Sequence, residues 1–409
     1  MRRFLLSLAA VLLVLGPPAQ AADPGLQRAL SRQMSQASSA SGAYVENLST
    51  GERTFAWRAG RARILASNVK LYTTSAALAR FGGDGTLGTE VLGGGELEEG
   101  GLWRGDLYLR GGGDPSFGSR SYVRRYYGGT GATVQALARL LDQAGIERIT
   151  GRVIGDESRF DSLRGGPDSG YGVSYWVGPL SAMSYNRGFA QENGSAFQLN
   201  PPAFAAARLD DALEARGIPV RRAPLAGVTP AGAEVLASVD SPPMERLVKL
   251  TNKVSDNFFA EMLAKGIAWQ VNGRGTTSAG AALTAGFAKR LGSAATLVDG
   301  SGLARGNRAS PYRTVRLLRA MARREEYEAL FQSLAIAGED GTMYNRMESG
   351  PAHRRCRAKT GTLSDVSALS GYCTARSGQT YAFSILMNRM YPTTARRLQD
   401  RMLQALAAR

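Results

Sequence analysis

The chain has 409 residues, with 50 Lys and Arg against 34 Asp and Glu, which gives a net charge of +16 at pH 7. Because the basic residues are scattered rather than gathered into an arginine-rich arm, nucleic acid is not the expected partner. The charge suits either an acidic extracellular polymer or solubility alone. A single histidine, His353, and only two cysteines disfavour a Ser-His-Asp triad, a histidine-rich metal site and a zinc site, so we expect no metal.

Residues 1–21 have the layout of a secretory signal peptide. Two arginines precede an apolar run from Phe4 to Leu15, and small residues follow at 19–21. The run is about a dozen residues long, whereas roughly 20 are needed to cross a bilayer. We therefore expect a secreted protein with no transmembrane anchor after cleavage.

Periodicity and turn residues then divide the chain into three parts. The first part is predicted to hold a helix, a hairpin and a buried helix, at 26–34, 42–57 and 70–81. Glycine-rich breaks separate short strands from about 85 to 243, with helices near 134–143 and 204–215. The last part is predicted to hold helices between 244 and 335, strands at 357–363, 366–374 and 380–387, and a final helix over 393–408.

These elements predict an α/β fold of the α+β type. The initial hairpin and the three final strands would form one antiparallel sheet of about five strands, flanked by helices. Residues 22–84 and 244–409 would then build one discontinuous domain. Residues 85–243 would form an inserted, mainly β domain.

Ser67 and Lys70 form the first of three short motifs that suit serine acyl transfer without histidine. They stand three residues apart in Ser-Asn-Val-Lys, so on a helix both side chains share one face. A lysine whose pKa is lowered, by burial or by a cation such as Lys359, can take the proton of a serine hydroxyl. Alone, the motif would indicate only a helix cap and a solvated lysine.

Ser255-Asp256-Asn257 is the second motif, in a predicted turn that enters a helix. Alternate side chains can point together there, so Ser255 would relay a proton to a leaving amine. Asn257 would bind a substrate amide and hold Lys70, while Asp256 would cap the helix. In isolation this motif would indicate an ordinary helix N-terminus.

The third motif, Lys359-Thr360-Gly361, lies on a predicted strand and is followed by Thr362. A strand edge can bind an extended peptide as an added strand. Lys359 and Thr360 suit a terminal carboxylate, and Gly361 leaves room for it. The amide N–H of Thr362 would join that of Ser67 in an oxyanion hole. A plain surface strand is the alternative.

Cys356 and Cys373 lie on either side of the predicted hairpin turn at Ser364-Asp365. Pairing Leu363 with Val366 brings the two cysteines opposite each other, and export permits oxidation. We therefore expect a disulfide, with two small buried thiols as the alternative.

Taken together, the motifs resemble those of the penicillin-recognising serine enzymes. Within these, the chain is similar to the D-alanyl-D-alanine carboxypeptidase/endopeptidase family of class C low-molecular-mass penicillin-binding proteins. Five segments carry the narrower resemblance, spread over most of the chain: 66–71, 109–115, 299–305, 338–342 and 358–363. The long gap between Lys70 and Ser255 is also a trait of that family, since beta-lactamases of this fold have a shorter one.

The resemblance implies a transpeptidase/beta-lactamase-like domain and a serine acyl-enzyme, with peptidoglycan stem peptides as substrates and beta-lactams as covalent inhibitors. It implies the periplasm or cell-wall space of a bacterium as the location, and no cofactor. Ser67 is then the nucleophile and Lys70 its base, Ser255 and Asn257 form the second motif, and Lys359 with Thr360 binds the carboxylate.

Two departures from the family pattern concern the inserted region. The stretch over 186–202 is too short for the third domain that members nest there, so this domain is expected to be reduced or absent. The loop over 170–176 lacks the acidic residue that meets the amino group of a diaminopimelate-type stem peptide.

Two other functions remain open from the sequence. One is a beta-lactamase or esterase of the same fold, although no glutamate stands in a recognisable water-activating loop. The other is a catalytically inactive wall-binding protein.

Overall fold

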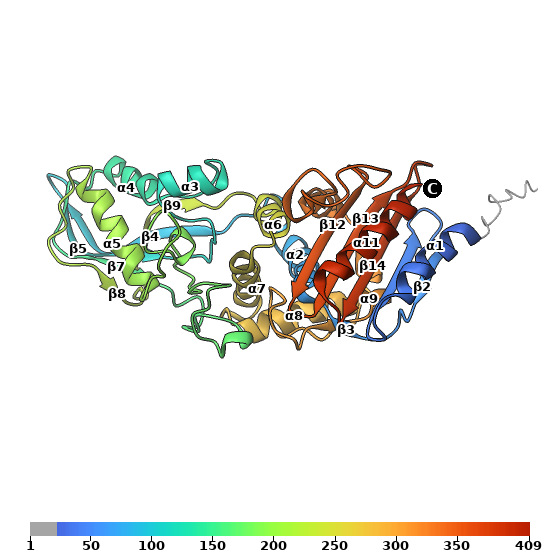
Figure 1. The fold of residues 1–409 in the computed structure, drawn as a ribbon. Coiled ribbons are helices and arrows are strands. Elements are labelled where there is room, and N and C mark those ends of the chain that lie inside the picture. The colour runs from blue at the N-terminus through green and yellow to red at the C-terminus, as the bar shows by residue number, and fades with distance from the viewer. Residues whose placement is uncertain (1–22) are drawn as a thin grey trace, which may run out of the picture.

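The computed structural model describes residues 23–409, so the predicted signal peptide lies outside the described residues. The molecule is elongated, with one sheet toward each end and a group of helices, including α2, α6, α7 and α8, between them (Figure 1). The first sheet uses strands from both ends of the chain. The second uses strands from the middle of the chain.

The first sheet has six strands in the order β11-β12-β13-β14-β1-β2. Their bounds are Ala335–Ile336, Cys356–Leu363, Val366–Thr374, Thr380–Asn388, Gly42–Asn47 and Arg53–Trp57. Every neighbouring pair is antiparallel. The predicted antiparallel sheet flanked by helices is therefore confirmed, and both termini of the described chain lie at this end of the molecule (Figure 1).

Helices cover both faces of the first sheet because its side chains alternate between two apolar cores. In β13, Leu369 and Cys373 belong to the core that includes α1 (Pro24–Ser35) and α11 (Pro392–Ala407). Ala368 and Tyr372 belong to the opposite core. The helices that contribute to this second core are α2 (Val69–Phe81), α6 (Met244–Lys253), α7 (Asn257–Asn272), α8 (Thr277–Arg290), α9 (Pro311–Met321) and α10 (Tyr327–Ser333).

The predicted count of about five strands is wrong by one strand. The additional strand, β11, has two residues and pairs with β12 at the edge of the sheet. Ala335 was expected in the preceding helix, which in fact ends at Ser333. A two-residue strand carries too little alternation to be recognised, because its pairing comes from the long strand beside it.

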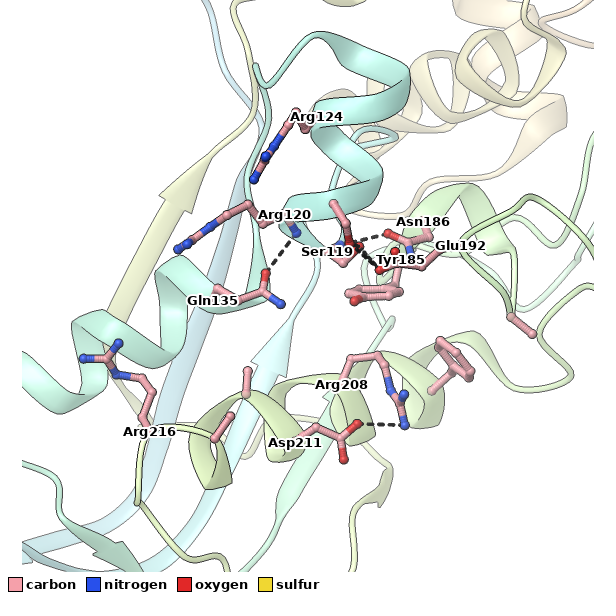
Figure 2. A pocket seen from close by; sticks show the side chains of 15 residues that line it. Ser119, Arg120, Arg124, Gln135, Tyr185, Asn186, Glu192, Arg208, Asp211 and Arg216 are labelled. Carbon is pink, nitrogen blue, oxygen red and sulfur yellow. Dashed lines mark hydrogen bonds and ion pairs between the residues drawn. The ribbon is translucent and has the colours of Figure 1, made fainter.

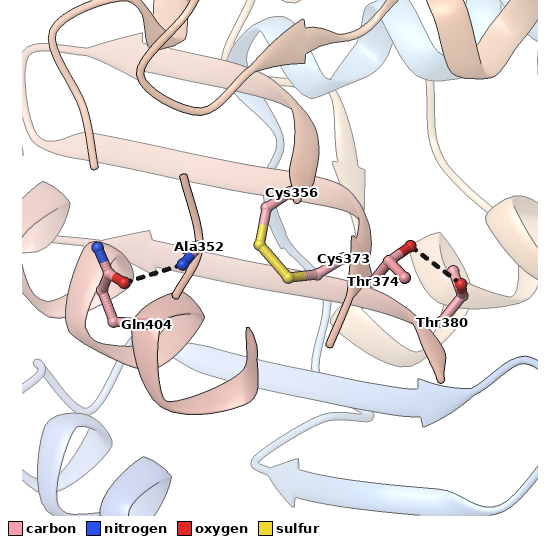
Figure 3. The surroundings of a disulfide bond; sticks show 6 residues. All are labelled: Ala352, Cys356, Cys373, Thr374, Thr380 and Gln404. Atoms are coloured by element: carbon pink, nitrogen blue, oxygen red, sulfur yellow. Dashed lines mark hydrogen bonds between the residues drawn. A yellow bond between two sulfur atoms is a disulfide. The ribbon is translucent and has the colours of Figure 1, made fainter. Parts of the chain in front are cut away.

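The hairpin of β12 and β13 has the predicted register, with Leu363 opposite Val366 and Cys356 opposite Cys373. The two cysteines are joined by a disulfide, and both are fully buried. Figure 3 shows this bond beside α11, whose Gln404 side chain accepts a hydrogen bond of 3.0 Å from the Ala352 amide.

The second sheet is mixed and also has six strands. The order is β8-β7-β5-β4-β9, with β6 paired to β5, and the bounds are Leu225–Ala226, Val153–Asp156, Leu102–Arg110, Gly88–Glu98, Glu234–Asp240 and, for β6, Arg148–Ile149. Three helices lie in the same part of the chain: α3 (Arg120–Tyr127), α4 (Val134–Gln143) and α5 (Pro201–Glu214). Of these, α3 was not anticipated from the sequence.

The segment over 186–202 holds a single 3-10 turn, Asn186–Gly188, and one isolated bridge between Phe189 and Phe197 before α5 begins. The domain boundaries proposed from the sequence, and the reduced nested domain, stay predictions. A separate two-stranded pair, β3 (Arg63–Ile64) with β10 (Arg308–Ala309), lies beside the first sheet.

Residues 23–409 hold neither a membrane-spanning helix nor a metal-binding cluster. None of the described helices is both long and apolar enough to span a bilayer. The described residues also contain no cluster of three or more His, Cys, Asp or Glu side chains that could hold a metal ion.

Candidate active site

Ser67 lies in a tight turn at the start of a buried helix. The 3-10 segment Ala66–Asn68 leads directly into α2, and Ala66 has a φ of +46°. Gly302 fits against this turn: a Cβ at Gly302 would lie 2.0 Å from the Ala66 carbonyl oxygen. The turn leaves the Ser67 side chain partly exposed, whereas Asn68 and Lys70 are buried.

The Lys70 amine is held at three points. Its Nζ lies 3.1 Å from Ser67 Oγ, 2.7 Å from Asn257 Oδ1 and 2.7 Å from the Ser301 carbonyl oxygen. Two oxygen acceptors therefore fix the amine while it faces the serine hydroxyl. The structure thus brings the first two motifs together, and the spacing of Ser67 and Lys70 predicted the contact within the first of them.

Burial lowers the pKa of Lys70 to about 8. The carboxylates of Asp299, Asp256 and Glu261 act in the opposite direction, since negative charge favours the ammonium form. Burial therefore outweighs three carboxylates. Either burial or a neighbouring cation was expected as the cause, and burial is the cause that lowers the pKa of Lys70.

Ser255-Asp256-Asn257 forms the predicted turn into a helix. Ser255 has a φ of +62°, and the Asp256 side chain caps α7 by accepting a hydrogen bond of 3.0 Å from the Phe259 amide. Ser255 and Asn257 both line the cleft that contains Ser67. Within residues 23–409, the Ser255 hydroxyl makes no hydrogen bond to Ser67 or Lys70.

The middle of the chain holds the second motif from two sides. Arg187 forms a two-pronged ion pair with Asp256, with distances of 2.9 Å and 3.2 Å. The Trp176 carbonyl oxygen accepts a hydrogen bond of 3.0 Å from Asn257 Nδ2. Neither residue was predicted from the sequence, because no local pattern links them to a motif so far along the chain.

The free edge of β12 faces the same cleft. Thr360, Gly361 and Thr362 line it, and β11 pairs only with the other end of the strand. In a hairpin with a two-residue turn, the two residues that flank the turn, here Leu363 and Val366, are hydrogen-bonded to each other. Hydrogen-bonded and non-hydrogen-bonded pairs then alternate along the strands, so the backbone N–H and C=O groups of Thr360 and Thr362 point away from β13, to the open edge. A Cβ at Gly361 would come within 3.0 Å of the Ser67 nitrogen, which shows how closely the strand approaches the serine turn.

Lys359 is fully buried behind this edge and is not part of the cleft lining. Its Nζ donates a hydrogen bond of 2.9 Å to the Thr360 carbonyl, and Asn68 Nδ2 donates one of 2.9 Å to the Lys359 carbonyl. Burial, and then the charge of Lys70, lower the pKa of Lys359 well below its ordinary value. Of the proposed pair for the carboxylate, only Thr360 lines the cleft directly.

Two buried carboxylates shape the loop whose Ser301 carbonyl holds Lys70. Glu261 accepts hydrogen bonds from the amides of Gly300 and Ser301, at 3.1 Å and 2.8 Å. Asp299 accepts bonds of 2.7 Å from the amides of Gly302 and Ala304. Burial raises the pKa of Glu261 to about 7. The 299–305 segment stood out in the sequence, whereas Glu261 did not.

The cleft at the three motifs has a volume of 640 Å³, and the exposed aromatic side chains of Trp176 and Tyr344 stand along it. A second hollow, of 620 Å³, lies beside α3 and α5 and contains none of the motif residues. Figure 2 shows that its two carboxylates already pair with neighbouring side chains: Asp211 with Arg208, and Glu192 with the Ser119 hydroxyl. The 640 Å³ cleft is therefore the candidate active site.

The fold and this cleft define a serine enzyme of the penicillin-binding type. The model of the D-Ala-D-Ala carboxypeptidase 3 (S13) family matches residues 26–195 and 190–409. The chain therefore belongs to this family of peptidases.

Individual relatives agree with this assignment. The chain is 30% identical to a D-alanyl-D-alanine carboxypeptidase of Actinomadura sp. (strain R39), over 90% of this chain and 79% of the relative. Its fold is similar to that of penicillin binding protein 4 (dacB) from Haemophilus influenzae, with a TM-score of 0.75 and 22% identity over 92% of this chain and 98% of that chain. It is also similar to a penicillin G acylated predatory endopeptidase from Bdellovibrio bacteriovorus, with a TM-score of 0.52 and 18% identity over 90% and 88% of the two chains.

Proposed function

We propose that the protein is a secreted serine D-Ala-D-Ala carboxypeptidase, with endopeptidase action on cross-linked stem peptides, that works through an acyl-enzyme on Ser67. The observation that carries this proposal is the position of Lys70 Nζ, which is within hydrogen-bond reach of both Ser67 Oγ and Asn257 Oδ1. A hydroxyl and an amine from one short segment therefore meet an amide from a distant part of the chain at one point of the cleft.

In the proposed acylation, neutral Lys70 takes the proton of Ser67, and Ser67 Oγ attacks the carbonyl carbon of the penultimate D-alanine. The C–N bond then breaks, and the terminal D-alanine leaves as an amine after Ser255 relays a proton to its nitrogen. Water hydrolyses the ester in the second half of the reaction and restores Ser67. The amides of Ser67 and Thr362 would bind the oxyanion in both halves.

Substrate binding would use the open edge of β12. An extended stem peptide can add there as a strand, because the backbone groups of Thr360 and Thr362 point outward. Its terminal carboxylate would lie at Thr360, with Lys359 close behind. Binding of that negative charge would raise the lowered pKa of Lys359 and so favour its ammonium form.

Beta-lactams would acylate Ser67. The similar endopeptidase from Bdellovibrio bacteriovorus has been captured in a penicillin G acylated form. The two carboxylates near Lys70, Glu261 and Asp299, are both buried, and neither lines the cleft, so neither meets a water molecule in the cleft. We therefore favour slow turnover of penicillin over a beta-lactamase function.

The test is release of D-alanine from a soluble stem pentapeptide by the mature chain. We expect release by the wild type and none by Ser67→Ala. A wild type that releases no D-alanine would contradict the proposal, and a Ser67→Ala variant with full biological effect would favour the inactive wall-binding alternative.

A further inference from the structure

A separate pocket of 350 Å³ lies where the β3–β10 pair meets the end of β14 and the turn between β12 and β13. It shares no lining residue with the catalytic cleft. Its charged lining consists of five arginines and one aspartate: Arg61, Arg63, Arg305, Arg308, Arg389 and Asp365. We call it the arginine pocket. In Figure 1, β3 lies at the lower edge of the half of the molecule that holds the first sheet.

The positive charges of the arginine pocket are mostly uncompensated. Arg305 pairs with Asp365. Among the residues that the structure describes, the other four arginines have no carboxylate within ion-pair distance. Like charges held together in this way repel one another and produce a strong positive potential.

Arg63 is built into the wall of the pocket rather than free in solvent. It is only 3% exposed, and its guanidinium donates to the backbone carbonyls of Ala40, Ser41 and Arg61, at 2.8, 2.8 and 2.5 Å. These contacts use neutral acceptors, so they fix the cation without cancelling its charge. Burial, together with the nearby charges of Arg58 and Arg61, lowers the pKa of Arg63 to about 10.

The hollow of Figure 2 differs from the arginine pocket in its charge balance. It is also lined by four arginines, but Arg208 pairs with Asp211 and Arg216 pairs with Asp142. Glu192 adds a further negative charge to its wall. An acidic ligand would therefore gain less there than in the arginine pocket.

We infer that the arginine pocket binds a phosphate group. Guanidinium groups bind phosphate through paired hydrogen bonds, and a phosphate monoester brings about −1.5 to −2 charges and three acceptor oxygens. One carboxylate, with a single negative charge, would leave most of the excess positive charge uncompensated. Inorganic phosphate brings this charge in one group, whereas a phosphate-bearing wall glycan brings one charge at each diester phosphate along its chain; the second would hold the enzyme on its polymer.

The experiment is calorimetric titration of the folded chain at low ionic strength, with inorganic phosphate in one series and a glycerol-phosphate oligomer in the other. Arg308→Glu combined with Arg389→Glu should weaken phosphate binding by about tenfold or more, because two cations become anions. Arg221→Glu combined with Arg222→Glu is the matched control, since these exposed arginines lie outside the pocket and the net charge changes equally. The control should bind as the wild type does.

Equal losses in the two double variants would overturn the inference, because net charge alone would then explain binding. No measurable binding of either phosphate probe, or equal binding of polyglutamate, would also overturn it. Tighter binding of the oligomer would identify a polymer as the source, and equal binding would identify a single phosphate group. Both double variants should release D-alanine from a soluble pentapeptide at the wild-type rate, and Ser67→Ala should bind phosphate normally, so the pocket and the proposed activity are tested separately.

Discussion

At the residue scale, the proposed chemistry depends on a lysine that is buried but not paired with a carboxylate. Lys70 is bonded to an amide oxygen and a backbone carbonyl rather than to Asp or Glu. A carboxylate in direct contact would hold the proton on the amine and remove its capacity as a base. The three acidic groups that act on Lys70 from further away only moderate the effect of burial.

The first prediction concerns pH. Because burial lowers the pKa of Lys70 to about 8, the neutral amine is the minor form at pH 7 and becomes the major form above pH 8. The rate of acylation by penicillin should therefore rise from pH 6, reach half of its maximum near pH 8 and level off above about pH 9. Stopped-flow measurement across this range checks it, and a rate that falls over the same interval would exclude Lys70 as the base.

The second prediction concerns Gly361. A methyl group there would press on the Ser67 nitrogen, so Gly361→Ala should displace β12 from the serine turn. We expect acylation to slow by about a hundredfold, the cost typical of a misplacement of about 1 Å. Gly83→Ala is the control, because a Cβ at Gly83 meets nothing within 4 Å. Equal rates in the two variants would contradict the proposed oxyanion geometry.

The sequence predicts the contacts of the site between residues that are close in the chain, and it predicts few of the contacts between distant residues. Ser67 and Lys70 are neighbours on one helical face, so spacing alone predicts their contact. The bond between Lys70 and Asn257 was expected only because three motifs occurred together. Trp176 contributes a backbone carbonyl, which any residue carries, so no side-chain pattern could identify it.

At the element scale, the ion pair of Arg187 with Asp256 joins the middle of the chain to the start of α7. Its two side chains are 18% and 17% exposed, so solvent screens it only partly. Asp256 also raises the pKa of Lys70, and Arg187 lies against that carboxylate. Loss of Arg187 would leave the negative charge of Asp256 uncompensated near the Lys70 amine.

The third prediction uses this pair. Arg187→Gln should slow acylation by about tenfold and shift the pH profile upward, because the free Asp256 carboxylate favours the ammonium form of Lys70. Adding Asp256→Asn should reverse the shift, since asparagine still caps α7 but carries no charge. Acylation rates against pH for the single and double variants measure it. A double variant that retains the full shift would mean that Arg187 does not act through Asp256.

The fourth prediction concerns the disulfide between β12 and β13. Closing a loop of this size stabilises the folded state by about 3 kcal/mol, chiefly by restricting the unfolded chain. Changing Cys356 and Cys373 together to alanine should therefore lower the free energy of unfolding by about that amount in urea titrations. Acylation should change little, because Cys356 lies roughly 13 Å along the strand from Thr360. Unaltered stability would contradict a structural role for the bond.

Most helices and strands were predictable because each carries its own periodicity and breaks. The exceptions have a physical reason. β11 has two residues and exists only through pairing, and α3 is a polar helix of eight residues whose buried side chains, such as Tyr122 and Tyr127, pack on distant elements. The burial of Lys359 was equally hidden, since it depends on segments far away in the sequence, such as the turn that holds Asn68, which pack against β12.

At the scale of the whole molecule, the parts of the chain that hold the two sheets contribute different residues to the cleft. The first sheet and its helices carry Ser67, Lys70 and the β12 edge. Trp176 and Arg187 lie in the middle part of the chain, which holds the second sheet, and they bond to Asn257 and Asp256 of the second motif. The cleft is therefore complete only when both parts of the chain are folded.

The fifth prediction concerns the net charge of +16. Association with an anionic wall should weaken as salt is raised from about 0.05 to 0.5 M, because exposed charges are screened. Hydrolysis of a short soluble peptide should change little over the same range, since Lys70 is buried and Ser67 is only partly exposed. At each salt concentration, co-sedimentation with purified wall material measures the association, and turnover of the soluble peptide measures the hydrolysis. Salt-independent association would show that the charge serves solubility alone.

The central claim is that Ser67 is the residue that becomes acylated, and the most direct test is intact mass spectrometry after exposure to penicillin, followed by mapping of the modified peptide. We predict one adduct per chain, on the peptide that contains Ser67, and no adduct in Ser67→Ala. An adduct on another peptide, or an equally acylated Ser67→Ala variant, would contradict the account.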